Sequence, residues 1–226
     1  MAVNTKSSPS AAEAGNPVCV TELLNKGADL NAKSRQGLAT LIAASLRGQL
    51  ETVRGILQCG VNPDTQNNDG DTALIVATKH NRMEVIDLLL ANGADPNVED
   101  MFGRTALIVA SSREYLETAR LLLTNGADPN VQNKYGDSAL ILAAREGKTE
   151  IIRLLLGNGA DPNLQNNDSL TALIVAAMRN RVEDFDLLLT NGAKPNLQNN
   201  KGDTALVLAA WNGIRVFGNS IDACRE

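Results

Sequence analysis

The stretch 133–165, NKYGDSALILAAREGKTEIIRLLLGNGADPNLQ, decides the fold, because its pattern returns every 33 residues on both sides. The glycine near its start, Gly136, has counterparts at Gly37, Gly70, Gly103 and Gly202, with Ser169 in the remaining copy. The glycine after its second apolar run, Gly159, recurs at Gly27, Gly60, Gly93, Gly126 and Gly192. A fixed period of about 20 to 50 residues indicates a solenoid of stacked repeats, in which only neighbouring repeats can cover each apolar face.

The first apolar run of each repeat is short, as in ALILAA at 139–144. Hydrophobic periodicity alone does not distinguish a run of this length from a buried strand. The residue before the run favours a helix, because a Ser or Thr hydroxyl there can accept a hydrogen bond from a free N–H group of a helix start. Such residues precede the runs at Thr72, Thr105, Ser138, Thr171 and Thr204.

The second run is longer and amphipathic. In the copy EIIRLLL at 150–156, isoleucines and leucines recur at the i, i+1, i+4 and i+5 spacing of one helix face. A glutamate in the first turn suits the positive end of the helix dipole. Such glutamates stand at Glu51, Glu84, Glu117, Glu150 and Glu183.

Stop signals follow the second run. Glycine takes positive φ without a Cβ penalty and so ends a helix. Asn-Gly pairs occur at 92–93, 125–126, 158–159 and 191–192. Prolines, which cannot continue a helix, come three residues after these glycines and after Gly60, and the set is Pro63, Pro96, Pro129, Pro162 and Pro195. Each repeat is therefore predicted to be a helix, a tight turn, a second helix and an extended, hairpin-like loop.

Together these features resemble the ankyrin repeat family, with its G-x-T-x-L motif, paired-alanine first helix, leucine-rich second helix and Gly-Ala-Asp-x-Asn loop. The family's usual Thr-Pro-Leu-His is replaced by Thr-Ala-Leu-Ile at 72–75, 105–108 and 171–174, Ser-Ala-Leu-Ile at 138–141 and Thr-Ala-Leu-Val at 204–207. We expect the isoleucine to pack where the family's histidine would form hydrogen bonds. The resemblance implies an all-α fold, an ankyrin-type α-solenoid of stacked helix-turn-helix units joined by hairpin-like loops.

The repeat boundaries predict a disordered N-terminal tail at 1–9 and a single ankyrin-repeat domain at 10–226. The domain divides into an N-terminal capping repeat at 10–33, full repeats at 34–66, 67–99, 100–132, 133–165 and 166–198, and a shortened unit at 199–226. The shortened unit lacks the leucine triplet and has Gly218 inside the expected helix. We interpret it either as a polar cap, which a solenoid needs at its end, or as a repeat cut from a longer polypeptide.

The composition restricts the class of partner and the compartment. A net charge of −5 argues against general attraction to nucleic acid or to an anionic membrane surface. No stretch approaches the roughly 18 apolar residues of a membrane span, and the first residues lack the apolar core of an export signal. We therefore predict no membrane insertion and a cytoplasmic localisation, with nuclear entry left open. The three cysteines are far apart, which fits reduced thiols.

The sequence offers no arrangement of catalytic or metal-ligating residues. Its single histidine, His80, gives little material for a Cys-His or Ser-His pair or for a multi-histidine metal site. The glycines stand at repeat turns, and no Gly-Lys-Ser/Thr follows them as in a phosphate-binding loop. The carboxylates Glu183, Asp184 and Asp186 are interpreted as a solvated helix face. We predict that the chain is not an enzyme and that it binds no cofactor or metal.

The resemblance implies that a protein or peptide partner binds the loop tips and the first helices, which line the concave side of such domains. Residues at these positions vary between copies and include three of the six aromatic side chains, Phe102, Tyr135 and Trp211. Exposed aromatic rings are candidate hot spots, and the alternative is that each ring covers a neighbouring repeat. The candidate partner-binding residues are Met101, Phe102, Arg104, Arg113, Lys134, Tyr135, Arg145, Met178, Arg179 and Trp211.

One cation per repeat is predicted to end the first helix, and the row comprises Arg47, Lys79, Arg113, Arg145 and Arg179. A cation in this place gains about 0.3–1 kcal/mol from the helix dipole, which is a sufficient structural reason for the row. The alternative is a basic ladder for an acidic partner. It would be flanked by acidic tips at Asp69, Asp71, Asp137, Asp168 and Asp203.

The function predicted from these observations is a non-enzymatic, monomeric scaffold for protein-protein interaction. The alternative is a targeting or spacer arm of a larger polypeptide, which could itself be enzymatic. The resemblance also implies a modification, because asparaginyl hydroxylases act on loop asparagines of ankyrin domains. The corresponding residues are Asn97, Asn130, Asn163 and Asn196.

Overall fold

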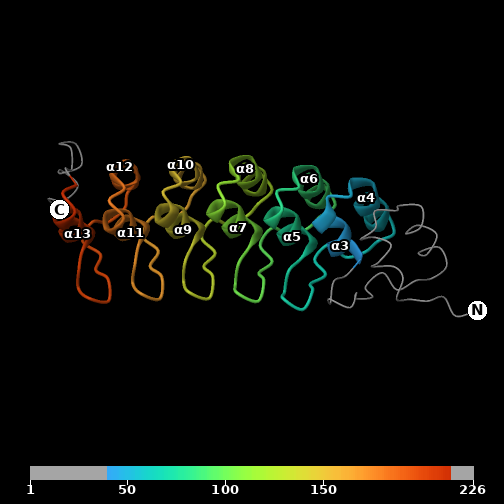
Figure 1. Cartoon of the computed structure of the whole chain (residues 1–226), viewed down its shortest axis with the longest axis horizontal. Coiled ribbons are helices and arrows are strands. Elements are labelled where there is room, and N and C mark those ends of the chain that lie inside the picture. The colour runs from blue at the N-terminus through green and yellow to red at the C-terminus, as the bar shows by residue number, and fades with distance from the viewer. Residues whose placement is uncertain (1–39, 215–226) are drawn as a thin grey trace, which may run out of the picture. The chain divides into compact units, whose positions relative to one another are not determined.

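The structure is a computed structural model that describes residues 40–214 (Figure 1). Within this range the chain forms eleven helices and no strand, which confirms the all-α prediction. The chain divides into two compact units, with the division between Ala106 and Leu107. The predicted tail at 1–9, the capping repeat at 10–33 and the last residues, 215–226, lie outside the described residues.

The first unit contains the helices α3 (Thr40–Arg47), α4 (Leu50–Gln58), α5 (Ala73–Lys79) and α6 (Met83–Ala91). The two helices of each repeat pack together, α3 on α4 and α5 on α6. The first helices of successive repeats, α3 and α5, are also in contact, as are the second helices, α4 and α6. The unit therefore has two layers, one of first helices and one of second helices.

The second unit repeats this arrangement. Its helices are α8 (Leu116–Thr124), α9 (Ala139–Glu146), α10 (Thr149–Gly157), α11 (Ala172–Met178), α12 (Val182–Thr190) and α13 (Ala205–Trp211), and α7 (Ala106–Ser112) begins at the division. The helices α9, α11 and α13 form the layer of first helices, and α8, α10 and α12 form the layer of second helices. The loops extend from the first helices on the side away from the second helices (Figure 1).

Hydroxyl residues start the first helices, as predicted. The Ile174 N–H donates a hydrogen bond to Thr171 Oγ1 at 3.2 Å, and the backbone of Thr171 is extended. Equivalent bonds of 3.2, 3.3 and 3.4 Å are made at Thr72, Ser138 and Thr204. Each cap satisfies a donor that the helix itself leaves open, which stabilises the helix by about 1 kcal/mol.

Asn-Gly pairs end the second helices, also as predicted. Gly159 has a φ of +84°, and its N–H donates to the Leu156 carbonyl at 3.2 Å. The next N–H, of Ala160, donates to the Leu155 carbonyl at 3.0 Å. These two bonds form a Schellman motif, which satisfies carbonyls of the last turn. The same pair of bonds occurs at Gly93, Gly126 and Gly192.

Aliphatic side chains from both helix layers form the core of each unit. The isoleucines at the expected histidine position are Ile75, Ile108, Ile141 and Ile174, and none is more than 2% exposed. They pack into the core as predicted. Burying one such side chain contributes about 1.5–3 kcal/mol relative to leaving it in water, so the replacement exchanges a polar contact for apolar burial.

Side-chain amides connect the loops of successive repeats in the second unit. Gln165 Nε2 donates to the Gln198 carbonyl, 33 residues later, at 3.0 Å. Asn163 bonds the next repeat with both ends of its amide, because Nδ2 donates to the Gly192 carbonyl at 3.2 Å and Oδ1 accepts from the Lys194 N–H at 2.7 Å. These bonds fix the register of the loops and hold the loop tips in place.

The loop tips turn at a residue with positive φ. At Gly136 φ is +75°, and a Cβ atom there would lie 2.7 Å from the Asn167 backbone nitrogen, so this tip requires glycine. In the next repeat Ser169 stands at the same position with a φ of +58°. Its hydroxyl donates to Asn200 Oδ1 at 2.6 Å, and this contact offsets part of the strain of a non-glycine residue.

Candidate functional site

The apolar and aromatic residues predicted to bind a partner all lie on the surface. The exposed fractions are 46% for Met101, 42% for Phe102, 65% for Tyr135, 48% for Met178 and 72% for Trp211. Neighbouring repeats therefore leave large parts of these side chains uncovered. Single exposed apolar residues are common, so what surrounds each of them decides its significance.

In the first unit, Met101, Phe102 and Arg104 form a cluster at the loop tip before α7. Arg104 Cζ lies 4.9 Å from the centroid of the Phe102 ring, a cation–π distance. Arg104 Nε and Nη2 also lie 2.8 and 2.7 Å from Asp100 Oδ2. The guanidinium is thus held against its own loop, and Met101 and Phe102 provide the exposed apolar surface.

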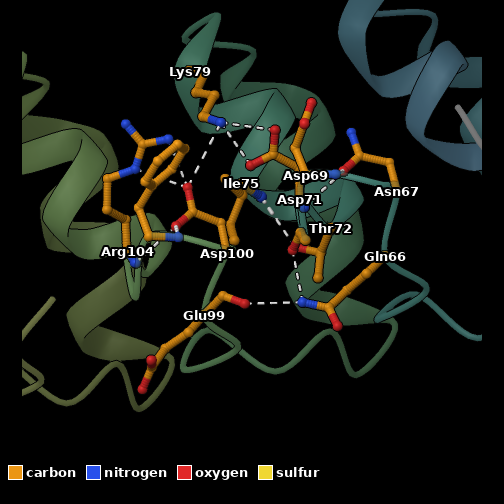
Figure 2. A network of polar contacts seen from close by, with 12 residues as sticks. Gln66, Asn67, Asp69, Asp71, Thr72, Ile75, Lys79, Glu99, Asp100 and Arg104 are labelled. Carbon is orange, nitrogen blue, oxygen red and sulfur yellow. Dashed lines mark hydrogen bonds and ion pairs between the residues drawn. The ribbon is translucent and has the colours of Figure 1, made fainter. Parts of the chain in front are cut away.

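Asp100 is the centre of a polar network in this unit (Figure 2). Its Oδ1 accepts hydrogen bonds from the N–H groups of Phe102 and Arg104 at 2.8 and 2.9 Å. Lys79 Nζ lies 3.9 Å from Asp100 Oδ2 and 2.6 Å from Asp71 Oδ1. Burial alone would raise the pKa of Asp100, but the hydrogen bonds from the Arg104 side chain and the two N–H groups outweigh it and hold the pKa below 3.8.

An acid and a base eight residues apart form the same ion pair in both units. Asp71 pairs with Lys79 in the first unit, and Asp137 accepts from Arg145 Nη1 and Nη2 at 2.8 and 2.9 Å in the second. Asp71 and Asp137 are 7% and 4% exposed. The prediction of acidic tips is therefore wrong for these two residues, because the start of each repeat folds back against the end of its own first helix.

These pairs change the interpretation of the predicted row of cations. Lys79 and Arg145 bind carboxylates of their own repeats, although 29% of the Arg145 side chain stays exposed. Arg113 and Arg179 are exposed at the ends of α7 and α11, and Lys134 is exposed at the loop tip beside Tyr135. Two of the cations thus contribute to the structure of their repeats, in addition to the dipole effect expected from their position.

The second unit contains a largely apolar groove between α11, α13 and the loops that precede them, which we call the Trp211 groove. Its volume is about 360 Å³. Its apolar lining consists of Leu170, Met178, Leu208 and Trp211, and its polar lining of Asp168, Asn199, Asn200, Lys201 and Asp203. The groove brings together two of the predicted residues, Met178 and Trp211, which are 33 positions apart in the sequence.

The Trp211 groove contains a carboxylate that lacks an ion pair. Asp203 holds the position that Asp137 holds in its repeat, and Trp211 stands where Arg145 would be expected. Between residues 40 and 214 no cation pairs with Asp203, and Asn199 Nδ2 approaches its Oδ2 at 3.4 Å, a long hydrogen bond. Sequence reasoning named Asp203 as an acidic tip but missed this relation, which an alignment of the repeats at the eight-residue spacing would have shown.

The predicted location of Asp184 is also wrong. It was expected on a solvated helix face but is only 2% exposed, and it stands where the repeat before it has the buried Ile151. Its Oδ1 accepts a hydrogen bond from Thr149 Oγ1 at 2.6 Å. Burial raises the pKa of Asp184, and this hydrogen bond together with the charge of Arg181 only partly opposes that rise.

The part of the chain at 40–214 holds no group of three His, Cys, Asp or Glu side chains arranged to bind a metal ion. None of its helices has the length and apolar character to cross a membrane. Cys59 is an exposed free thiol, and His80 is exposed at the end of α5.

Stacked pairs of short helices joined by long loops define a helical repeat protein, and solved ankyrin repeat domains are among the structures that share this fold. The ankyrin repeat domain of Bcl-3, described as a unique member of the IkappaB protein family, matches with a TM-score of 0.84 and 29% identity over 97% of each chain. An ankyrin repeat domain from Acinetobacter baumannii AYE matches with a TM-score of 0.77 and 28% identity, over 83% of this chain and 98% of that one.

The sequence itself leads to the same class. A family model of ankyrin repeats matches residues 10–100, 41–133, 97–166 and 140–225, and the chain belongs to the ankyrin repeat family. A comparison with curated proteins gives no match. Ankyrin repeats generally mediate protein-protein interaction.

Proposed function

We propose that this chain is a non-enzymatic scaffold that binds a protein or peptide partner through its first helices and loop tips, the concave face of such domains. The observation that supports this most is Trp211, an indole that is 72% exposed beside Met178 in an apolar groove. Tryptophan next to a pocket is typical of a binding hot spot, where truncation costs about 2 kcal/mol or more.

The rest of the second unit suits the same role. The hydrogen bonds of the Asn163 and Gln165 side-chain amides hold the loops in register before a partner binds. Binding therefore costs little conformational entropy. The exposed cations Arg113 and Arg179 would attract acidic residues of the partner at other points of the surface. The scaffold would act as a monomer.

The test uses a display library of random 12-residue peptides, about the length of a short extended segment, selected on the full chain. Dissociation constants of the selected peptides are then measured for the natural chain and for Trp211→Ala and Met178→Ala. We expect Trp211→Ala to weaken binding by about 10-fold or more, because the indole is the largest exposed apolar group of the groove. Met178→Ala should weaken it less.

The matched control is Val182→Ala, which truncates a side chain that is 38% exposed on α12 and does not line the groove. It should leave the dissociation constants unchanged. All three variants should melt within about 2 °C of the natural chain, because surface truncations have small effects on stability. Equal loss of binding in Trp211→Ala and Val182→Ala would refute the assignment.

A further inference from the structure

We propose that the Trp211 groove binds an arginine or lysine side chain of the partner, with the cation held between the Asp203 carboxylate and the Trp211 ring. This inference rests on the proposed function and adds the chemistry of the partner residue that the groove selects.

Two other repeats show what a carboxylate in this position binds. Lys79 Nζ lies 2.6 Å from Asp71 Oδ1, and Arg145 Nη1 lies 2.8 Å from Asp137 Oδ2. The repeat that begins at 199 keeps the acid, as Asp203, but has the indole of Trp211 in place of the base. A cation from the partner would therefore occupy the place that the chain's own cation occupies in the other two repeats.

In the first unit, a carboxylate, an aromatic ring and a cation of this chain already lie together. The guanidinium of Arg104 lies 4.9 Å from the centroid of the Phe102 ring and bonds the Asp100 carboxylate at 2.7 and 2.8 Å. A carboxylate, an aromatic ring and a guanidinium thus come together on this scaffold without a metal or a ligand. The Trp211 groove provides the first two of these three groups.

Hydrogen bonds of its backbone groups hold Asp203 in place, so its carboxylate is not needed for this purpose. Its N–H donates to Asn199 Oδ1 at 2.9 Å, and its carbonyl accepts from the Asn199 N–H at 3.0 Å. A carboxylate can accept about four hydrogen bonds, and the structure provides the 3.4 Å contact to Asn199 Nδ2. The part of the chain at 40–214 therefore leaves most of the capacity of this carboxylate for a partner's donor groups.

The apolar lining suits the stem of a basic side chain. Lysine and arginine place their methylene groups along apolar surface while the charged end reaches a polar partner. Met178 and Leu208 offer such surface beside Trp211. We expect arginine to bind more tightly than lysine, because a planar guanidinium can stack on the ring and also donate two parallel bonds to the carboxylate.

The other charged groups of the groove set the number of cations that it accepts. Among residues 40–214, the lining contributes the carboxylates of Asp168 and Asp203 and the ammonium group of Lys201. Two negative charges and one positive charge leave a single negative charge to balance. We therefore expect one basic residue in the bound segment, flanked by apolar residues, and a modest dependence of the affinity on salt concentration.

The test extends the peptide selection to a parallel selection on Asp203→Asn. Peptides selected on the natural chain should share an arginine or lysine beside an apolar residue, and those selected on Asp203→Asn should not. In a shared peptide, replacing the basic residue with glutamine should raise the dissociation constant about 10-fold on the natural chain and about 2-fold or less on Asp203→Asn. Loss of the effect in the variant would show that the two groups interact.

The control for net charge is Asp87→Asn, an exposed acid on α6 in the other unit, which should change neither the selection nor the dissociation constant. Selected peptides without a shared basic residue would overturn this inference and leave the proposed function intact, whereas recovery of no peptide would contradict both. If Asp203→Asn instead weakens self-association in sedimentation, a second copy of the chain occupies the groove and the inference is wrong.

Discussion

The repeat at 133–165 and the repeat that begins at 199 have the same helix cap and the same loop turn. They differ at one pair of positions, an acid at the start of the repeat and the residue eight positions after it. In the former, Asp137 binds Arg145 at 2.8 and 2.9 Å, and the acid is nearly inaccessible to water. In the latter, Asp203 has no ion pair among the described residues, and the residue eight positions later is the exposed Trp211. The difference teaches that one substitution at the end of a first helix can turn a closed ion pair into an open groove while caps and turns stay the same.

Breaking the closed pair should have the largest effect on stability. Arg145→Met leaves the carboxylate of Asp137, which is 4% exposed, with Asn166 Nδ2 at 2.7 Å as its remaining side-chain donor. We expect the free energy of unfolding to fall by about 2–3 kcal/mol, less than for a fully buried pair, because Arg145 is 29% exposed. Urea unfolding followed by circular dichroism measures the change.

The matched control for this prediction is Arg179→Met. Arg179 is exposed one residue beyond the equivalent position in the next repeat, where Met178 stands. Its replacement should change the free energy of unfolding by no more than about 0.5 kcal/mol. Similar losses of unfolding free energy in the two variants would mean that the ion pair between Asp137 and Arg145 does not specifically stabilise the second unit.

Completing the ion pair at Asp203 should raise the free energy of unfolding, by less than the loss expected for Arg145→Met. Trp211→Arg places a base eight residues after Asp203, as in the repeat of Asp137. We expect the free energy of unfolding to rise by about 1 kcal/mol, the upper end for a partly exposed pair, and peptide binding to be lost. In the double variant with Asp203→Asn the gain in stability should disappear, and a gain that survives would point to a cause other than the ion pair.

The fold could be predicted from the sequence because its determinants are local. A cap such as Thr171 acts on an N–H three residues away, and a stop such as Gly159 acts on the turn immediately before it. The burial of Ile141, at the position of the family's histidine, could be predicted in the same way, since an apolar residue in an apolar run needs only burial. Each of these signals returns at the same spacing, so one copy supports the interpretation of the others.

The candidate site was predicted only in part, because it depends on contacts that no helical or strand period encodes. The exposed ring of Trp211 could be named from its variable position, but the burial of Asp137 follows from a loop that folds back on a helix end eight residues later. The Trp211 groove also requires two successive repeats to bring Met178 beside Trp211. Asp184 was misplaced because a carboxylate at a core position contradicts the expected pattern.

Asp184 extends the comparison to a buried acid whose partner is a hydroxyl. Asp100, with its arginine, has a lowered pKa, so its contribution to stability is present above pH 3.8 and is lost as the pH falls through its folded-state value. Asp184 has a raised pKa, so the folded state takes up a proton before the unfolded chain does. Its charged form therefore opposes folding at neutral pH, and this opposition fades as the pH falls toward 3.8.

The smallest predicted effect follows from this sign. Asp184→Val introduces the residue that the first unit has at the same position, Val85, which is 1% exposed. We expect the free energy of unfolding at pH 7 to rise by roughly 0.5–1 kcal/mol, because an apolar residue replaces a buried charge that forms no salt bridge within residues 40–214. The gain should shrink as urea unfolding is repeated at lower pH down to 3.8, since protonation of Asp184 removes the same cost from the natural chain. A gain that is equal at every pH in this range would show that packing, and not the charge, sets the stability at this position.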